Sequence, residues 1–164
     1  MTLFKKREPD LGDLAAYVVE SARGRSVTVN HGRLVLLLYL VDVERVRSRR
    51  EPVTGVAWEL GRRGPTAQGL DRTLRAHIAR EKESTQWGRG TARESFRDGS
   101  RGDDWIVGTK LLVDGVVRTY AGLDLDELRA YVETQTGPMA EAVEGELLRL
   151  ALARDDRRRP PGRS

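Results

Sequence analysis

The sequence predicts an α+β fold that is mostly helical, with about five helices and a small antiparallel sheet of about three strands. Apolar residues recur at helical spacing in several stretches, which indicates the helices. Two shorter segments are rich in β-branched and aromatic residues and contain or adjoin turn residues, which indicates the strands. The 164 residues, of which 38% are apolar and 33% charged, suit one globular domain.

Two helices are expected in the first third of the chain. Asp10 is a candidate N-cap for a first helix that ends near Gly24. Asn30 is a candidate N-cap for a second helix, in which the apolar run 34–41 covers the full circumference. Because a helix that is apolar on every side must be surrounded, we expect the second helix at the centre of the fold. The apolar stripe of the first helix comprises Leu11, Leu14, Ala15, Val18, Val19 and Ala22.

A strand and a third helix are expected in the middle of the chain. The segment 52–58 reads PVTGVAW and is bounded by Pro52 and Gly61, which predicts a short strand. Apolar residues at helical spacing then predict an amphipathic helix over about 66–80. The following segment, 81–104, is polar and rich in Arg, Gly and Ser, which predicts a long mobile loop.

The last third of the chain predicts a hairpin and two helices. In 105–120 two apolar segments flank Asp114-Gly115, a dipeptide typical of a type I′ turn, and so predict a β-hairpin. Asp124 or Asp126 is expected to start a helix that stops at Gly137. Pro138 is expected to open another helix. The buried side of that last helix is predicted to carry Met139, Val143, Leu147 and Leu150.

The charge distribution suggests three regions. The chain carries a net charge of +4, but residues 1–7 and 154–164 each hold +3, which leaves −2 for residues 8–153. We therefore expect a flexible basic N-terminus over 1–9, a single domain over 10–153 and a disordered basic tail over 154–164. Because the positive excess lies at the ends rather than on a folded face, this pattern argues against dedicated nucleic-acid binding.

The sequence also indicates a cellular compartment. There is no cysteine, which excludes disulfides and thiolate metal sites. The longest apolar run has eight residues, whereas a membrane-spanning helix needs about 20. The N-terminus has charges but no apolar stretch of the secretory type. We expect a cytoplasmic protein with no membrane partner.

Residues suited to catalysis are few. The two histidines, His31 and His77, lie in no nucleophile or metal pattern, and His31 is expected to cap a helix or lie on the surface. The carboxylates around Asp104 and Asp124 are interpreted as a loop end and a helix cap rather than as magnesium ligands. Asp42 lies at the edge of the central helix, where a nearby Arg is expected to pair with it. We therefore expect no enzyme activity, no cofactor and no metal.

The exposed basic and aromatic residues are candidates for a partner. The arginines at 45–50 and at Arg62-Arg63 can contact an acidic surface, although a solvated helix end and loop explain them as well. Trp58 is expected in the core. Trp87 lies in the polar segment and either folds back onto the domain or meets a partner, and the sequence leaves both open.

Three motif pieces arrive in order and at a characteristic spacing. They are Leu37-Leu38-Tyr39-Leu40-x-Asp42, Pro52-Val53-Thr54-Gly55-x-x-Trp58 and Gly64-Pro65. Together they resemble the Panacea domain of the SocA-like antitoxins, with its "KLLYxxD" helix, "PITGxxY" and a Gly-Pro six residues after the aromatic. The resemblance covers about 11–78. This chain departs from the pattern at Leu36, Arg63 and Thr66, where the family commonly has a lysine, an aromatic and an apolar residue.

The resemblance implies a bacterial or phage antitoxin or adaptor that neutralises a cognate toxin by direct protein contact, with a protease or chaperone as a further partner. Two alternatives stay open: a DNA- or RNA-binding regulator that uses the basic tail, and a carboxylate- and metal-dependent enzyme. The resemblance implies the signature positions Leu38, Tyr39, Asp42, Thr54, Gly55, Trp58, Gly64 and Pro65. Exposure and chemistry favour Arg45, Arg49, Arg62, Arg63 and Trp87 as partner-binding candidates.

Overall fold

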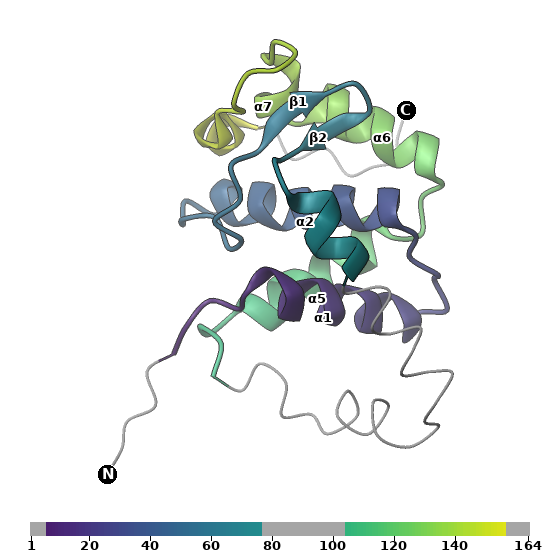
Figure 1. Ribbon diagram of the computed structural model, residues 1–164. Coiled ribbons are helices and arrows are strands. Elements are labelled where there is room, and N and C mark those ends of the chain that lie inside the picture. The colour runs from purple at the N-terminus through teal and green to yellow at the C-terminus, as the bar shows by residue number, and fades with distance from the viewer. Residues whose placement is uncertain (1–5, 77–103, 157–164) are drawn as a thin grey trace.

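Helix α2 lies between two layers of structure in the computed structural model, which describes residues 6–76 and 104–156. Helices α1 (Leu11–Arg23) and α5 (Thr109–Tyr120) pack on one side of α2 (His31–Arg47). The hairpin of β1 (Glu59–Gly61) and β2 (Gly64–Thr66) lies on the other side with helix α6 (Leu125–Gln135), as Figure 1 shows. The short helix α7 (Gly137–Ala140) and the 3-10 helix η1 (Leu150–Asp155) complete that layer. The predicted class, mostly helical with a small antiparallel sheet, fits the described residues.

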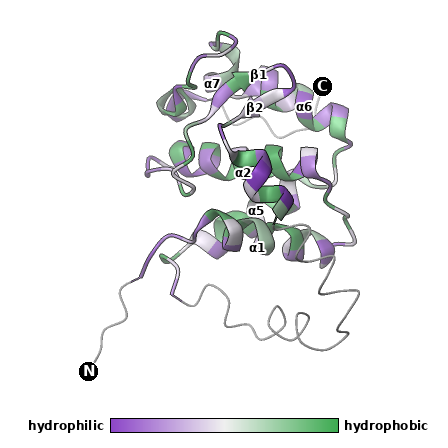
Figure 2. Cartoon of the chain, in the orientation of Figure 1, coloured by the Kyte–Doolittle hydropathy of each residue, from purple (hydrophilic) through white to green (hydrophobic). Residues whose placement is uncertain are grey.

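Local capping and periodicity explain the first two helices, which were predicted correctly. The Asp10 carboxylate accepts a hydrogen bond from the Asp13 N–H, and the Asn30 side chain accepts one from the Arg33 N–H. Residues 36–43 of α2 are all buried, as a central helix requires. Figure 2 shows hydrophobic residues along much of α1 and α2. No helix in the described ranges has both the length and the apolar character to span a bilayer.

The hairpin predicted over 105–120 is wrong, because most of this segment forms helix α5. Its buried side chains, at positions 113, 116, 117 and 120, follow helical rather than alternating spacing, and this face packs against α1 and α2. The Asp114-Gly115 dipeptide lies within the helix. The Asp114 carboxylate accepts hydrogen bonds from the Tyr17 and Ser21 hydroxyls of α1, which joins the two helices. Tertiary packing therefore overrides the local turn preference of Asp-Gly.

The buried tyrosines predict that the free energy of unfolding falls at alkaline pH. Burial and the Asp114 carboxylate raise the pKa of Tyr17 to about 12 from an ordinary value of 10.0, and burial also raises the pKa of Tyr39 and Tyr120. Because these phenols stay neutral in the folded protein but ionise in the unfolded chain, their stabilising effect is complete below pH 10 and is lost as the pH rises toward 12.

Absorbance at 295 nm during a pH titration is expected to show these tyrosines ionising only well above pH 10, together with a falling free energy of unfolding. Tyr17→Phe should remove one delayed proton from the titration and leave the rest. A folded protein in which all the tyrosines ionise near pH 10 would contradict the buried arrangement.

The strand predicted over 52–58 is also wrong, because these residues form a loop between α2 and the hairpin. The strands begin only at Glu59, and the described residues contain two strands rather than three. Glu59 pairs with Thr66, Leu60 with Pro65 and Gly61 with Gly64, so the turn consists of Arg62 and Arg63. Gly64 follows the turn with φ of +111°, a conformation that favours glycine. Gly64 and Pro65 therefore lie beside the turn and open β2.

The helix predicted after Pro138 ends at Ala140, which corrects the expected buried face. Met139 is buried as predicted, but Val143 and Leu147 are 59% and 67% exposed. The backbone of 145–148 instead follows β1: the Leu148 N–H donates to the Trp58 carbonyl at 2.8 Å, and the Gly145 N–H donates to the Leu60 carbonyl at 2.9 Å. Backbone pairing with a distant strand thus replaces further helical turns.

The N-terminal region predicted to be flexible contains anchored residues. The Arg7 N–H donates to the Asp104 carbonyl at 2.8 Å, and the Arg7 side chain pairs with the Asp104 carboxylate at 2.6 Å. Glu8 contacts the buried side chain of Arg45 at 3.0 Å. Residues 7 and 8, within the N-terminus predicted over 1–9 to be flexible, therefore contact the folded body, whereas residues 1–5 lie outside the described ranges.

The C-terminal boundary moves in the same way. Residues 154 and 155, the first of the tail predicted over 154–164, belong to η1, and Asp156 contacts the buried Arg47. The helix predicted over 66–80 begins at Leu70 and is helical through residue 76, the last residue described before the gap. The predicted loop 81–104 lies outside the described residues apart from Asp104, and residues 157–164 also lie outside them.

Candidate functional site

The Asp42 carboxylate joins two of the motif pieces found in the sequence. Its Oδ1 accepts hydrogen bonds from the backbone N–H groups of Val53 at 2.8 Å and Thr54 at 2.9 Å. Its Oδ2 accepts from the Trp58 indole N–H at 2.8 Å and from the Thr54 hydroxyl. The predicted Arg partner is wrong: neutral donors from the loop 53–58 surround Asp42 instead. These donors explain why this loop does not extend into a strand.

Burial determines the electrostatics of this carboxylate. Asp42 is fully buried, and burial raises its pKa, while the four hydrogen bonds that stabilise the charged form act in the opposite direction. The Trp58 ring packs edge-on against Tyr39, with 5.6 Å between centroids, and the Tyr39 hydroxyl contacts the Thr136 hydroxyl at 3.0 Å. Leu38 is also fully buried. The signature residues on α2 and Trp58 therefore organise the core and fix the start of the hairpin.

Arg45, predicted as an exposed partner contact, is buried. Its guanidinium donates to the Thr109 hydroxyl at 2.6 Å and to Glu8 at 3.0 Å, which links α2 to α5 and the N-terminal segment. Because α2 packs against elements on both sides, the Arg45 side chain meets acceptors on its neighbours before it reaches solvent. Arg49 lies two residues beyond the end of α2 and is exposed, as predicted. Trp87 lies outside the described residues.

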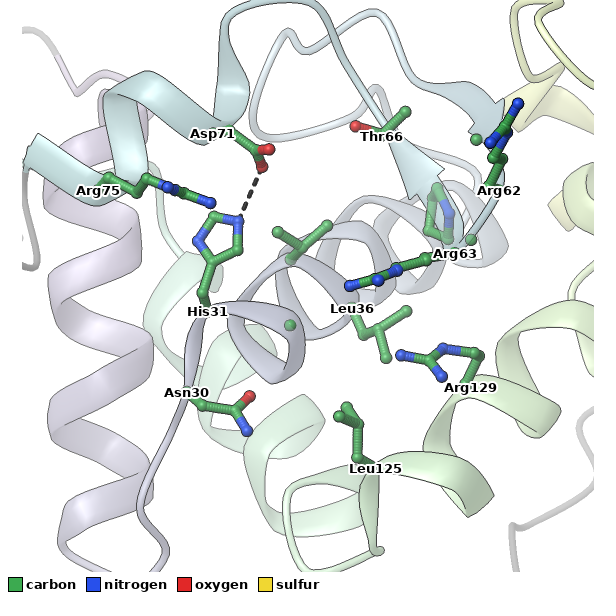
Figure 3. A pocket seen from close by; sticks show the side chains of 15 residues that line it. Asn30, His31, Leu36, Arg62, Arg63, Thr66, Asp71, Arg75, Leu125 and Arg129 are labelled. Carbon is green, nitrogen blue, oxygen red and sulfur yellow. Dashed lines mark hydrogen bonds and ion pairs between the residues drawn. The ribbon is translucent and has the colours of Figure 1, made fainter.

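The two arginines of the hairpin turn point in different directions (Figure 3). The Arg63 side chain extends into the space beside Leu36, whereas the Arg62 side chain extends away from this space. Arg62 is 94% exposed in its side chain and lies 3.9 Å from Glu144. The turn therefore contributes to two different surfaces. Both arginines were predicted as partner contacts, but nothing in the sequence separates their directions.

The first surface combines exposed apolar side chains with a cation. We call it the outer face, consisting of Arg62, Val143, Glu144 and Leu147. Leu147 lies opposite Glu59 of β1 and also borders an apolar groove of about 430 Å³ that includes Val56, Ala67 and Leu70. Exposed aliphatic residues beside an arginine are typical of protein-binding surfaces. Sequence periodicity missed this surface because it placed Val143 and Leu147 on a buried helical face.

The second surface is a cleft of about 590 Å³ between the start of α2, the hairpin, residues 70–76 and α6. We call it the arginine cleft. His31, the first residue of α2, lies here with Nε2 2.8 Å from the Asp71 carboxylate, and its side chain is 31% exposed. The surface position predicted for His31 is confirmed in part. Sequence reasoning missed the cleft because its arginines, Arg62, Arg63, Arg75 and Arg129, come from three separate segments.

The carboxylates weighed as metal ligands have structural partners. Asp124 accepts a hydrogen bond from the Glu127 N–H at 2.8 Å and caps α6, as predicted. Asp104 pairs with Arg7, and Asp103 lies outside the described residues. Within 6–76 and 104–156, three or more His, Cys, Asp or Glu residues nowhere cluster closely enough to hold a metal ion. Comparison with protein-family models, with curated proteins and with solved structures found no match for this sequence.

Proposed function

We propose that this chain is a cytoplasmic, non-enzymatic antitoxin or adaptor of the Panacea type that neutralises a cognate toxin by direct binding. The observation that supports this proposal is the assembly around Asp42. Thr54 and Trp58, which are signature residues 12 and 16 positions away in the sequence, donate to one buried carboxylate. The motif pieces thus act as one structural unit, which makes their resemblance to the Panacea pattern more specific than separate short matches.

The outer face is the surface we assign to the toxin. Leu147 is 67% exposed and Val143 59% exposed, so both side chains offer apolar area that a partner can bury. Arg62 extends from the hairpin turn, with its guanidinium 3.9 Å from Glu144, and can donate to an acidic partner. The Asp42 unit holds the loop that leads into this hairpin. Neutralisation requires binding alone, and a nanomolar complex corresponds to about −12 kcal/mol.

A genetic test and a matched pair of variants examine this proposal. Expression of the adjacent reading frame alone is expected to stop growth, and co-expression of this chain is expected to restore growth and yield a complex. Leu147→Glu should weaken the complex by roughly 10-fold or more and reduce rescue, because it places a charge in an apolar contact. The melting temperature should change little, since the native side chain is mostly exposed.

Leu111→Glu is the matched control. Leu111 is 78% exposed and lies on α5, in the layer opposite the hairpin, so this variant introduces the same charge away from the outer face. It should leave rescue and affinity unchanged. The absence of both rescue and a complex would refute the proposed function. Equal effects of the two variants would refute the assignment of the outer face.

A further inference from the structure

The arginine cleft concentrates positive charge on a body that is otherwise slightly acidic. Four arginines border it, of which Arg63, Arg75 and Arg129 extend their side chains into it, and Asp71 is the one carboxylate among the described lining residues. Figure 3 shows Arg63 and Arg129 extending into the cleft from the same side, near Leu36, while Arg75 extends toward His31 from the opposite wall. Residues 8–153 as a whole carry −2. The cleft therefore gathers cations from elements far apart in the sequence.

The arginines that extend into the cleft have few carboxylate partners among the described residues. Among the described residues, Arg63 and Arg75 form no ion pair, and the Arg129 guanidinium lies 3.8 Å from Asp126, whose side chain is 97% exposed. Asp71 is bound to His31 at 2.8 Å. The exposed, distant pair of Arg129 and Asp126 contributes little. The guanidinium donors are thus available to an anion that enters the cleft.

One buried donor, Arg129 Nε, supports this interpretation independently of the charge. Arg129 Nε and His31 Nδ1 are buried, and neither has a hydrogen-bond partner among the described residues. Buried polar atoms are normally satisfied, and leaving one unpaired costs free energy. Both residues line the arginine cleft from opposite sides, one on α6 and the other on α2. A ligand acceptor oxygen would supply the partner that the Arg129 Nε–H lacks, whereas the Nδ1 of a neutral His31, whose Nε2–H faces Asp71, can only accept.

The backbone adds to the positive potential. Asn30, His31 and Gly32 of the cleft form the N-terminal end of α2, a helix of 17 residues with no acidic residue in its first turn, whereas the start of α6 carries Asp124, Asp126 and Glu127. Helix N-termini carry a partial positive charge that favours anions. The apolar residues Val35, Leu36 and Leu125 provide wall area beside the cations. The cleft thus combines a cationic rim with apolar surface.

We propose that the arginine cleft binds a small organic phosphate, with Arg63, Arg75 and Arg129 donating to the phosphate oxygens. A volume of about 590 Å³ lies within the range of small-ligand sites, roughly 300–1,000 Å³. A phosphate monoester carries about −1.5 to −2 at pH 7 and offers three acceptor oxygens, which suits several guanidiniums better than one carboxylate does. The organic part contacts Val35, Leu36 and Leu125. This site is distinct from the outer face, because Arg62 extends away from the cleft.

Calorimetric titration of the full chain with adenosine diphosphate, inorganic phosphate and adenosine tests the proposal. The diphosphate is expected to bind with a stoichiometry of one, more tightly than inorganic phosphate, and adenosine is expected to bind weakly or not at all. Arg63→Ala and Arg75→Ala should each weaken diphosphate binding by roughly 10-fold or more, because each removes a charged donor. Both side chains belong to exposed residues, so the variants should fold.

Arg118→Ala is the matched control, since Arg118 is an exposed arginine on α5. It removes the same charge and should leave binding unchanged. Addition of diphosphate should also shift the imidazole NMR signals of His31, assigned with His31→Gln. Equal weakening by all three arginine variants, or no diphosphate binding at millimolar concentration, would overturn the proposal. Tighter binding of a hexaglutamate peptide than of the diphosphate would overturn it in favour of an acidic polypeptide segment.

The proposals for the cleft and for the toxin can fail separately. Loss of diphosphate binding in Arg63→Ala with unchanged toxin rescue supports the cleft alone. Loss of rescue in Leu147→Glu with unchanged diphosphate binding supports the outer face alone.

Discussion

Asp42→Ala is expected to lower the free energy of unfolding by about 3 to 5 kcal/mol. The substitution removes the acceptor for four donors, among them the buried N–H of Val53 and the indole N–H of Trp58. Each buried donor left without a partner costs about 1 to 3 kcal/mol, although the Thr54 hydroxyl can turn elsewhere. Urea denaturation measures the change. Glu51→Ala, which removes an exposed carboxylate nearby, should change stability by less than about 0.5 kcal/mol.

A double-mutant cycle separates the hydrogen bonds of Asp42 from its volume. In Asp42→Asn, the amide oxygen can still accept from the Val53 and Thr54 N–H groups, but the amide nitrogen then faces the Trp58 indole N–H. The indole is a donor only and cannot adapt. Asp42→Asn should therefore cost about 1 kcal/mol less in a Trp58→Phe background than in the native chain. Strict additivity of the two substitutions would show that this contact does not stabilise the fold.

Arg47→Met is expected to destabilise the protein by a similar amount, about 3 to 5 kcal/mol. The Arg47 side chain is 3% exposed and contacts the Asp156 carboxylate at 2.8 Å and Glu44 at 2.7 Å. It also donates to the Tyr131 hydroxyl at 3.2 Å and to the Gln135 carbonyl at 3.0 Å. Methionine fills most of the volume but leaves Asp156 buried without its cation. Thermal or urea unfolding measures the loss.

The position of Asp156 gives this prediction a local readout. Asp156 Oδ1 accepts from the Gly137 N–H at 2.8 Å, and a Cβ at Gly137 would lie 2.7 Å from the same oxygen. The Gly137 amide should therefore exchange with solvent faster in Arg47→Met, because the carboxylate that protects it loses its anchor. Arg49→Met, an exposed arginine two residues further on, should change neither stability nor exchange. Asp156→Asn combined with Arg47→Met should recover part of the loss, since it removes the unpaired charge.

The hydrogen-bond networks of Arg45 and Arg47 explain why neighbouring arginines of the sequence differ in role. Arg45 and Arg47 lie within α2 and are buried against other elements, whereas Arg49 lies beyond its end and is exposed. Prediction from composition treated this run as one basic cluster. The burial of α2 on all sides decides which of these side chains become structural, and only contacts with Glu8, Thr109 and Asp156 show it.

Local sequence signals were sufficient where they agreed with the packing. The caps Asp10, Asn30 and Asp124 predicted helix starts, because a capping side chain bonds to a backbone N–H three residues away. The local turn signal at Asp114-Gly115 was misleading, because the turn preference of this dipeptide competed with the burial of a helical face against α1 and α2. The arginine cleft could not be predicted, because Arg63, Arg75 and Arg129 meet only after the chain has folded.

The sequence by itself predicted the central position of α2, the starts of α1 and α2 and the burial of Trp58, and it left the start of α6 between Asp124 and Asp126, because caps and periodicity act within a few residues. The tertiary structure alone decided that 52–58 is a loop bound to Asp42, that 109–120 is a helix and that Val143 and Leu147 face solvent. It also decided which arginines line the cleft. These outcomes depend on hydrogen bonds and contacts between residues distant in sequence, whose free energies exceed the preferences of short segments.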